Sequence, residues 1–404
     1  MEIPRSAIVV VIDRLGSGIV GPYGNTWVDS PTMNRLASES LLYETAIADT
    51  VCLDTIYRSY WQGVHAVAPR SESPVTLPRE AAAAGIEMLL LTDSERVAQH
   101  PLARDFSSGT NLAQTDAPTP AATLDETRSG QLFAAAIDEL TGRSSPYCLW
   151  VHADAMNSAW DAPYAVRESL ADDDDPPPPN MVIPPNFQLD GEIDPDELLG
   201  VSQAYGGEVA ALDRILDAFL DAIGSLPQVE ETLLVVTSSR GFAIGEHGNV
   251  GACGDKLFGE VLQVPLLVRF PDQRMASRRC PNLVQPHDVC ATLFDWFGLK
   301  APEAMWGSSL LDIKNTSPKR CAVAVAGEEC AIRTPIWHLR SAPPEPAMLF
   351  AKPDDRWEVN EVANRCPDVV AELASTLESF RAQANSTCLP CLPQLSDDLV
   401  TEFG

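Results

Sequence analysis

The sequence predicts an α/β fold with a doubly wound, mostly parallel central sheet, helices on both faces of that sheet, and a small C-terminal α+β subdomain. Two patterns support this prediction. Short apolar, β-branched runs alternate along the chain with longer amphipathic runs, which is typical of parallel strands joined by crossover helices. The apolar runs are continuous rather than alternating, as expected for strands buried on both faces.

The expected elements follow from these runs. The predicted strands of the central sheet are Ala7–Ile12, Met88–Thr92, Tyr147–Val151, Thr232–Thr237 and Val264–Arg269. The predicted helices are Thr32–Ser40, Leu77–Ala84, Asp125–Leu140, Val201–Ile223 and His287–Phe297. In the helix over 201–223, an acidic face is expected opposite the apolar stripe, formed by Asp213, Asp217 and Asp221.

The pattern changes after about residue 301. We therefore predict a main domain over residues 1–300 and a subdomain over residues 301–404. The subdomain is expected to contain a helix over Pro367–Gln383 and short strands over Cys321–Ala326, Ala331–Leu339 and Ala347–Ala351.

An acidic, proline-rich excursion interrupts the main domain over about residues 165–200. Glu168–Glu197 holds ten acidic residues and no Lys or Arg, and Asp172–Asp175 is followed directly by Pro176–Pro179. Such a stretch can be neither a helix nor a central strand. We interpret it as an acidic surface loop, with a calcium site as the alternative.

The charge of the chain limits its partners. The 28 Lys and Arg residues against 57 Asp and Glu residues give a formal net charge of −29. Because an acidic surface repels phosphate backbones and anionic lipids at long range, neither nucleic acid nor a membrane is expected as a partner. A small anionic ligand or a protein partner remains open, and a small anion would need a locally positive pocket. Composition does not determine the oligomeric state.

The first residues, MEIPRSAIVVVID, contain an apolar run that is too short for a signal-peptide core or a spanning helix, so we expect a cytoplasmic protein. Ten cysteines in 404 residues are too sparse for a disulfide scaffold, and most should be reduced. Cys388 and Cys391 are the one close pair, which either binds a metal or forms a disulfide, or consists of two ordinary thiols.

Residues directly after the strands matter most, because a sheet of this kind binds its ligands at the carboxyl ends of the strands. In this chain these residues are Asp13 and Arg14, Asp93, His152–Asp154, and Ser238–Arg240.

Taken in order, these segments resemble the sulfatase family of the alkaline-phosphatase-like superfamily. VVVIDRLGSGIVGPYGN, from residue 9, is similar to the family's opening, where a strand ends in Asp-Asp-Leu-Gly. WVHADAMNSAWDAPY, over 150–164, resembles the segment with a Pro-His-x-Pro element, and LLVVTSSRGFAIGEHG, over 233–248, resembles the "TSDHGxxxGEHG" segment. The similarity extends over about residues 7–383, and the order and spacing of the segments are specific for the fold.

The resemblance implies a metal-assisted hydrolase of sulfate esters, in which four oxygen-rich side chains hold a divalent cation. At those places this chain retains Asp13 but has Arg14, Ser239 and Arg240 instead of the other three ligands. A guanidinium has no acceptor atom and cannot bind a cation. We therefore expect no metal cofactor, with calcium or magnesium as the alternative if the site has been rebuilt.

The family's nucleophile is an oxidised cysteine, formylglycine, in a Cys-x-Pro-x-Arg motif. TVCLDTIYRSYWQG, over 50–63, stands in its place, but Asp54 replaces the proline and Ile56 replaces the arginine. Cys52 is therefore either a small buried thiol or an unconventional nucleophile.

Further candidates could rebuild the chemistry. Thr50 or Thr55 offers a hydroxyl nucleophile with His152 as the base, although Asp54 and Thr55 equally fit a helix N-cap. Arg58 takes the part of the motif arginine only if the register slips.

The other binding groups of the family are mostly replaced. The resemblance places Asn157 where the Pro-His-x-Pro histidine should be, His247 in the "GEHG" string, and Lys256 near the position of a late lysine. Asp154 follows a buried strand and could face the cleft together with His152.

The loss of the metal has an electrostatic consequence. An unpaired Asp13 in a dry cleft would be costly, so we predict that Asp13 lies within salt-bridge distance of Arg240 or Arg14. The two guanidinium groups would then stand in the cation's place, where they could hold an oxyanion.

Three functions are consistent with these residues. Changes in four separate segments favour a sulfatase-like pseudoenzyme without metal or formylglycine chemistry, which binds an anion or a protein. The alternatives are an active sulfuric or phosphoric ester hydrolase with a rebuilt site, and a structural or oligomerisation role. Resemblance in fold does not by itself establish activity.

Overall fold

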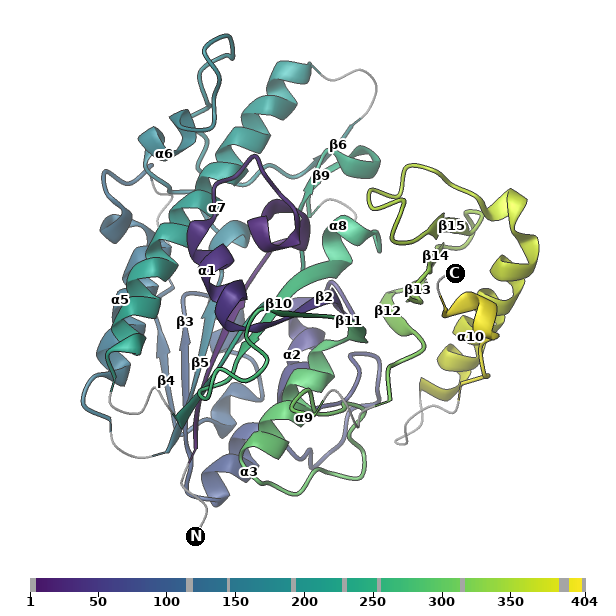
Figure 1. Ribbon diagram of the computed structural model, residues 1–404, viewed down its shortest axis with the longest axis horizontal. Coiled ribbons are helices and arrows are strands. Elements are labelled where there is room, and N and C mark those ends of the chain that lie inside the picture. The colour runs from purple at the N-terminus through teal and green to yellow at the C-terminus, as the bar shows by residue number, and fades with distance from the viewer. Residues whose placement is uncertain are drawn as a thin grey trace. The chain divides into compact units, whose positions relative to one another are not determined.

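The computed structural model describes residues 5–113, 119–143, 146–189, 194–226, 231–252, 256–312, 317–384 and 392–401. Its largest sheet contains the strands β1 (Ser6–Ile12), β2 (Leu41–Ile47), β3 (Glu87–Thr92), β4 (Ser108–Asn111), β5 (Tyr147–Ala153), β7 (Thr232–Ser238), β10 (Gln263–Arg269) and β11 (Arg278–Val284). Their order is β11-β2-β10-β7-β1-β5-β3-β4 (Figure 1).

The remaining strands form two small antiparallel sheets. One contains β12 (Ala322–Ala326), β13 (Glu329–Arg333), β14 (Trp337–Ser341) and β15 (Met348–Ala351) in that order, and the other contains β6 (Phe187–Gln188), β9 (Asn249–Gly251) and β8 (Ala243–Ile244). The predicted fold class, a mostly parallel central sheet with helices and a small C-terminal α+β part, is confirmed.

The α-helices are α1 (Pro31–Glu39), α2 (Leu53–Gln62), α3 (Leu77–Ala83), α4 (Glu95–Ala98), α5 (Arg128–Leu140), α6 (Tyr164–Glu168), α7 (Pro195–Gly224), α8 (Gly259–Leu262), α9 (Pro286–Trp296) and α10 (Pro367–Ala384). Contacts divide the chain into two compact units. Unit 1 comprises Met1–Leu42, Gly85–Gly254 and Val264–Arg279, and unit 2 comprises Tyr43–Ala84, Asp255–Gln263 and Cys280–Gly404. The predicted domain boundary near residue 300 stays a prediction.

The centre of unit 1 is the run of parallel strands β7-β1-β5-β3. Every residue of β1, β5 and β7 is buried, as their continuous apolar sequences predicted. On one face, α5 and α7 lie side by side (Figure 1) and contribute Phe133 and Phe219, whose rings meet edge to face at 5.1 Å. Strand β10 pairs with β7 in the antiparallel direction, so the sheet is mixed at that point.

The acidic face expected on α7 does not point to solvent throughout. Asp213 is buried, and its two carboxylate oxygens accept hydrogen bonds from the backbone amides of Thr32 and Met33 at 2.9 and 2.8 Å. The first turn of a helix leaves its amides without partners inside the helix, and here a carboxylate from another helix supplies them. Asp217 and Asp221 both pair with Arg35 of α1.

The acidic excursion matches its prediction for the described residues, except at its end. No helix or strand occurs between α6, which ends at Glu168, and the two-residue strand β6. The fully buried Arg167 donates to the carbonyls of Pro179 and Met181 at 2.9 and 2.7 Å, which fastens the proline-rich part to the fold. Helix α7 begins at Pro195, six residues earlier than expected, with Asp194 as its N-cap.

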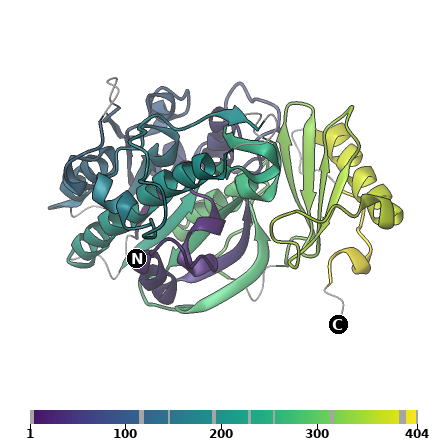
Figure 2. The ribbon, with the colours of Figure 1, turned by 90° about the horizontal axis from the view of Figure 1, so that it is seen from above.

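Unit 2 contains the four-stranded sheet, with α10 packed on one face of it (Figure 2). The helix presents Leu373, Leu377 and Phe380 to the core formed with Ile332 and Leu339. The single strand expected over 331–339 is in fact two, β13 and β14, with a turn at Thr334 and Pro335 closed by the Thr334 amide on the Trp337 carbonyl. A proline cannot donate to a sheet and so marks this turn.

Among the described residues, no helix combines the length and the apolar character that a bilayer span requires. A cytoplasmic location stays a prediction, and Cys388 and Cys391 lie outside the described residues.

Gly130 provides a test of packing in the first turn of α5. A Cβ atom at this position would lie 2.1 Å from the Leu124 carbonyl oxygen, whereas nothing lies within 4 Å of a Cβ atom at Gly109 in β4. We expect Gly130→Ala to lower the free energy of unfolding by about 2 kcal/mol or more, because backbone must shift, and Gly109→Ala to change it by less than about 0.5 kcal/mol. Urea unfolding followed by circular dichroism measures both, and equal effects would contradict the packing.

Candidate functional site

The register of the parallel strands gathers the end-of-strand residues at one edge of the sheet. Ile12 of β1 pairs with Ala153 of β5 and with Ser238 of β7, and Thr92 of β3 pairs with His152. Asp13, Asp93, Asp154 and Ser239 therefore emerge in neighbouring positions, all within unit 1. The Asp13 amide continues the ladder by donating to the Ala153 carbonyl at 2.8 Å.

Asp13 is the centre of this site. Its carboxylate is fully buried, and Arg240 donates to both of its oxygens, from Nε to Oδ1 and from an Nη to Oδ2, each at 3.0 Å. The Ser239 hydroxyl makes a short hydrogen bond to Oδ1. Burial alone would raise the pKa of Asp13, but the charge and hydrogen bonds of Arg240 hold it well below its usual range, with Arg14 and His152 contributing further. The prediction that Asp13 pairs with Arg240 or Arg14 is confirmed, and the partner in the ion pair is Arg240.

The backbone loops after β1 and β7 hold Asp13 and Arg240 in place. Arg14 adopts a positive φ of 65°, and its carbonyl accepts a hydrogen bond of 2.7 Å from the buried Tyr205 hydroxyl of α7. The Ser238 hydroxyl donates to the Arg240 carbonyl at 2.7 Å and accepts from the Leu15 amide at 3.2 Å. Each loop is thus held by the other. The Arg14 guanidinium is buried and reaches the Gly241 carbonyl at 3.4 Å.

Two further carboxylates, those of Asp154 and Asp93, lie beside the carboxylate of Asp13. Asp154 makes hydrogen bonds with Asn157 through the Asn157 side-chain amide, at 3.2 Å, and through the Asn157 backbone amide, at 2.8 Å. Asn157 also accepts from Arg240 at 3.3 Å, which links the carboxylates of Asp13 and Asp154 in one network. Asp93 Oδ1 accepts the Asp154 amide at 2.7 Å, and Asp93 Oδ2 has no hydrogen-bond partner among the described residues. Burial, and secondarily the charge of Asp154, raises the pKa of Asp93 to about 6.

His152 lies within this network. Its ring is fully buried, and Nε2 is 3.9 Å from an oxygen of Asp154. One ligand atom each from Asp13, His152 and Asp154 lie within 4.8 Å of one another. The predicted residues Asp13, Arg240, His152 and Asp154 are thus brought together, and Arg14 is adjacent to them.

The hard divalent cation implied by the family fits these residues poorly. Calcium and magnesium take six or more oxygen ligands, but both oxygens of Asp13 already accept bonds from Arg240, and a second guanidinium stands nearby. A histidine with two carboxylates is instead a donor set that suits a transition metal. Such an ion would fit only if Arg240 released Asp13.

The predicted nucleophile segment belongs to unit 2. Cys52 is exposed, so the expectation of a small buried thiol is wrong. Cys52 is itself the N-cap of α2, and the expected cap at Asp54 and Thr55 is shifted, because both lie in the first turn. The Thr55 hydroxyl donates to the Cys52 carbonyl at 3.1 Å. Arg58 directs its guanidinium to the carbonyls of Ala66, Ala68 and Pro69 at 3.1, 2.7 and 3.0 Å, where it holds a loop of its own unit.

The last two candidates are His247 and Lys256. His247 has a positive φ of 51° in a short 3-10 turn of unit 1, and Lys256 is half-buried before α8 in unit 2. Asp93 is the site residue that sequence reasoning did not select. Its position directly after a buried strand was the signal, but the sequence assigned no role to it.

Removing one partner of the buried pair should be costly. Asp13→Ala and Arg240→Ala are each expected to lower the free energy of unfolding by about 3–5 kcal/mol, because each leaves a buried charge unpaired. The double variant should cost clearly less than the sum of the two. Arg269→Ala is the matched control, since its pair with Glu39 is partly exposed and should contribute less than about 1 kcal/mol. Chemical denaturation measures all four variants, and strict additivity at Asp13 and Arg240 would contradict the pairing.

Asp93→Asn should stabilise the protein. The pKa of Asp93 is raised from 3.8 to about 6, so the unfolded chain ionises first as the pH rises, and stability is lost between these values. An asparagine does not ionise and so removes this loss of stability, while its side-chain oxygen still accepts a hydrogen bond from the Asp154 amide. We expect a gain of about 2–3 kcal/mol at pH 7 that disappears below about pH 4. Asp138→Asn, at an exposed position of α5, is the matched control and should change the free energy of unfolding by less than about 0.5 kcal/mol.

Comparison with curated proteins finds partial matches. An N-acetylglucosamine-6-O-sulfatase of Bacteroides thetaiotaomicron is 27% identical over 117 residues, which are 28% of this chain and 20% of that protein. A multifunctional alkaline phosphatase superfamily protein, PehA, of Trinickia caryophylli is 30% identical over 123 residues, 30% of this chain and 23% of its own length. Arylsulfatase K of Canis lupus familiaris is 23% identical over 214 residues, 47% and 38% of the two chains. The chain thus matches well under half the length of each of these relatives.

Solved structures show the same fold over the whole chain. A phosphonate monoester hydrolase of Agrobacterium radiobacter has a TM-score of 0.73 with 16% identity and covers 94% of this chain and 96% of its own. A putative sulfatase of Bacteroides thetaiotaomicron has a TM-score of 0.75 with 15% identity and covers 95% and 93%. The family model described as Sulfatase matches residues 5–299, which include the whole Asp13–Arg240 network, and the chain belongs to the sulfatase family.

Proposed function

We propose that this protein is a sulfatase-family pseudoenzyme that binds a small oxyanion at the Asp13–Arg240 network and does not carry out metal- and formylglycine-dependent hydrolysis. The observation that carries this proposal is the two-point contact of Arg240 with both oxygens of Asp13. Two N–H groups of a guanidinium donate in parallel to the two oxygens of a carboxylate, and they donate in the same way to two oxygens of a sulfate or phosphate. The group that neutralises Asp13 can therefore exchange it for an anionic ligand.

The surroundings of the pair support a small ligand. Arg240 is only 5% exposed, whereas Asn157 at its side is exposed and Asp154 is partly so. An anion that approaches past Asn157 meets the guanidinium of Arg240, with that of Arg14 near Asp13. The two guanidinium groups supply the positive charge that an anion needs in a chain with a net charge of −29, and they do so beside the carboxylates of Asp13 and Asp154.

Anion binding has a counterintuitive consequence at Asp13. Because the carboxylate competes with the ligand for Arg240, we expect Asp13→Asn to strengthen sulfate or phosphate binding by about tenfold or more. Arg240→Ala should abolish this binding, and Arg240→Lys should keep only part of it because the fork is lost. Isothermal titration calorimetry with sodium sulfate and sodium phosphate at fixed ionic strength measures all three variants. Weaker binding in Asp13→Asn would overturn the proposal.

An active ester hydrolase with a rebuilt site is the second candidate, and the cluster of Asp13, His152 and Asp154 favours it. In that case Asp13→Asn and Asp154→Asn should both lower the metal content and the turnover. For Asp13→Asn this loss is the opposite of the stronger anion binding that the first proposal expects. Hydrolysis of aryl sulfate and aryl phosphate with added calcium, magnesium, manganese or zinc, together with elemental analysis, tests it. Metal-dependent turnover abolished by Asp13→Asn would replace the first proposal.

A protein partner, and the exclusion of nucleic acid and membranes as partners, stay predictions from charge.

A further inference from the structure

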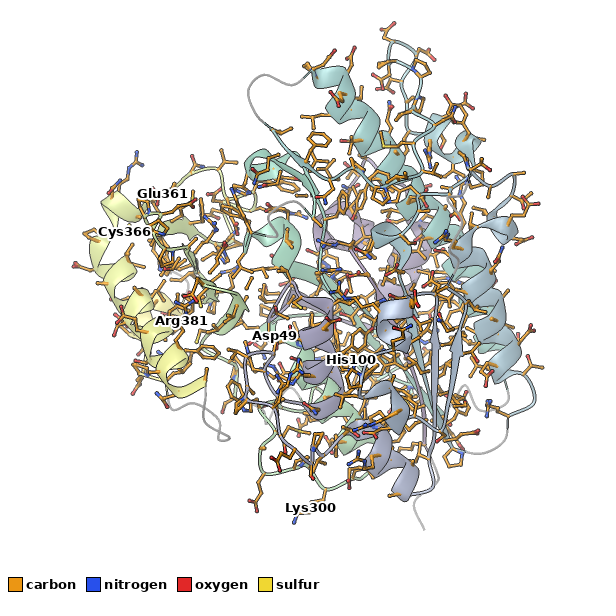
Figure 3. The ribbon with its side chains drawn as sticks, turned by 180° about the vertical axis from the view of Figure 1, so that it is seen from behind. Asp49, His100, Lys300, Glu361, Cys366 and Arg381 are labelled. Atoms are coloured by element: carbon orange, nitrogen blue, oxygen red, sulfur yellow. The ribbon has the colours of Figure 1, made fainter. Side chains whose placement is uncertain are left out.

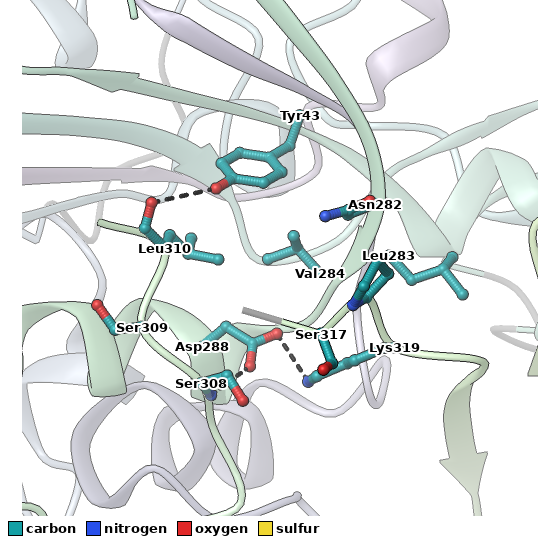
Figure 4. A pocket seen from close by; sticks show the side chains of 11 residues that line it. Tyr43, Asn282, Leu283, Val284, Asp288, Ser308, Ser309, Leu310, Ser317 and Lys319 are labelled. Atoms are coloured by element: carbon teal, nitrogen blue, oxygen red, sulfur yellow. Dashed lines mark hydrogen bonds and ion pairs between the residues drawn. The ribbon is translucent and has the colours of Figure 1, made fainter. Parts of the chain in front are cut away.

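Unit 2 contains a pocket of about 480 Å³ that is formed entirely by its own residues. A volume of this size is typical of small-molecule sites. The adjoining cavity, where Asp288 bonds Lys319 and Tyr43 bonds the Leu310 carbonyl (Figure 4), measures only about 30 Å³, so it has room for little more than water. The larger pocket is lined by residues of the loop after α2, the start of α9, the segment around β12, the end of α10 and the C-terminal segment from Leu392 to Leu395.

One wall of the pocket is aromatic. The rings of His65, Trp306 and Phe380 contact one another, with centroids 5.6 Å apart for His65 and Trp306, 5.1 Å for His65 and Phe380, and 6.1 Å for Trp306 and Phe380. Leu392 and Leu395 complete the apolar lining. Three rings held by mutual packing offer stacking and edge contacts to a flat apolar group.

The charged donor of the pocket is Lys319. Its ammonium donates to Nε2 of His287 and to Oδ2 of Asp288, both at 2.7 Å, which leaves one of its three N–H groups for a ligand. Its side chain is 22% exposed, so it is held in place yet accessible. Arg320 adjoins it and is tied back to the Leu395 carbonyl and to Asp397.

The two histidines of the wall are held by hydrogen bonds. Nε2 of His65 donates to the Val323 carbonyl at 2.9 Å, and Nδ1 accepts from the Val67 amide at 3.2 Å, so the ring has no place for a second proton. Burial lowers the pKa of His65 to about 4. His287 accepts from Lys319, as described above. Asp49, labelled in Figure 3, is fully buried, and its Oδ2 lies 4.0 Å from His65 Nδ1 and 3.9 Å from His287 Nδ1. It accepts hydrogen bonds from the Ser59 hydroxyl at 2.5 Å and from the Ala66 amide at 2.8 Å.

We propose that this pocket binds a small aromatic carboxylate, with the ring against His65, Trp306 and Phe380 and the carboxylate on the third N–H of Lys319. The ammonium of Lys319 is already paired with the carboxylate of Asp288 at 2.7 Å, which favours one negative charge on the ligand over two, because a dianion would be repelled more strongly by that carboxylate. A neutral ligand would leave the lysine N–H without an acceptor in a partly desolvated site. This site is independent of the Asp13–Arg240 network.

Three probes that share one phenyl ring test the proposal by isothermal titration calorimetry on the full chain: benzoate, phenyl phosphate and benzyl alcohol. We expect benzoate to bind with a Kd on the order of 0.1–1 mM and the other two to bind at least about tenfold more weakly. Lys319→Met should weaken benzoate binding by about tenfold or more. Lys300→Met is the matched control, because Lys300 projects to solvent after α9 (Figure 3). This variant should bind benzoate as the unmodified chain does.

A second variant keeps the test decisive if Lys319→Met unfolds. Phe380→Leu preserves an apolar side chain but removes one ring, and it should weaken benzoate several-fold while circular dichroism shows a folded protein. No benzoate binding by the folded chain, or binding that Phe380→Leu leaves unchanged, overturns the site. Equal binding of benzyl alcohol overturns the role of Lys319, and tighter binding of phenyl phosphate overturns the preference for one charge.

Discussion

The ion pair of Asp13 and Arg240 is the constraint on which the candidate site depends. A carboxylate that is fully buried at the end of a central strand must be neutralised, and here a guanidinium contacts both of its oxygens. This one contact joins the loops after β1 and β7, positions Asn157, and occupies the oxygens that a divalent cation would need. The same contact is the basis of the anion binding that we propose for this site.

The site also shows how charge is distributed in an acidic protein. The net charge of −29 is partly a property of surface segments such as the excursion over 168–197, whereas buried acids each have a defined partner or a shifted pKa. Asp213 is held by the first-turn amides of α1, and Glu208 accepts from the Ala162 amide and from Arg167. Among the described residues, Asp93 combines an oxygen that has no hydrogen-bond partner with a raised pKa. Such uncompensated groups are retained mainly at functional sites, at a cost in stability.

Most of the fold was predictable because its central strands are buried on both faces and therefore continuously apolar. The strands β1, β3, β5, β7 and β10 were each found to within two residues at either end. The strands β2, β4 and β11 were missed. The run over 41–47 mixes polar and apolar residues, that over 108–111 is fully exposed, and that over 278–284 carries arginines and a proline, so none has the apolar signal of a central strand.

The sequence by itself determined the family resemblance, the parallel sheet and the loss of three expected metal ligands, because these depend on residue types in a fixed order. It also made a guanidinium beside Asp13 an expectation, since a buried charge requires a partner. Only the tertiary structure decided that the partner is Arg240, that Asp93 and Asn157 complete the network, and that Lys319 and three rings line a pocket in unit 2. These residues are far apart in the chain, and strand register and helix packing, which no local pattern records, bring them together.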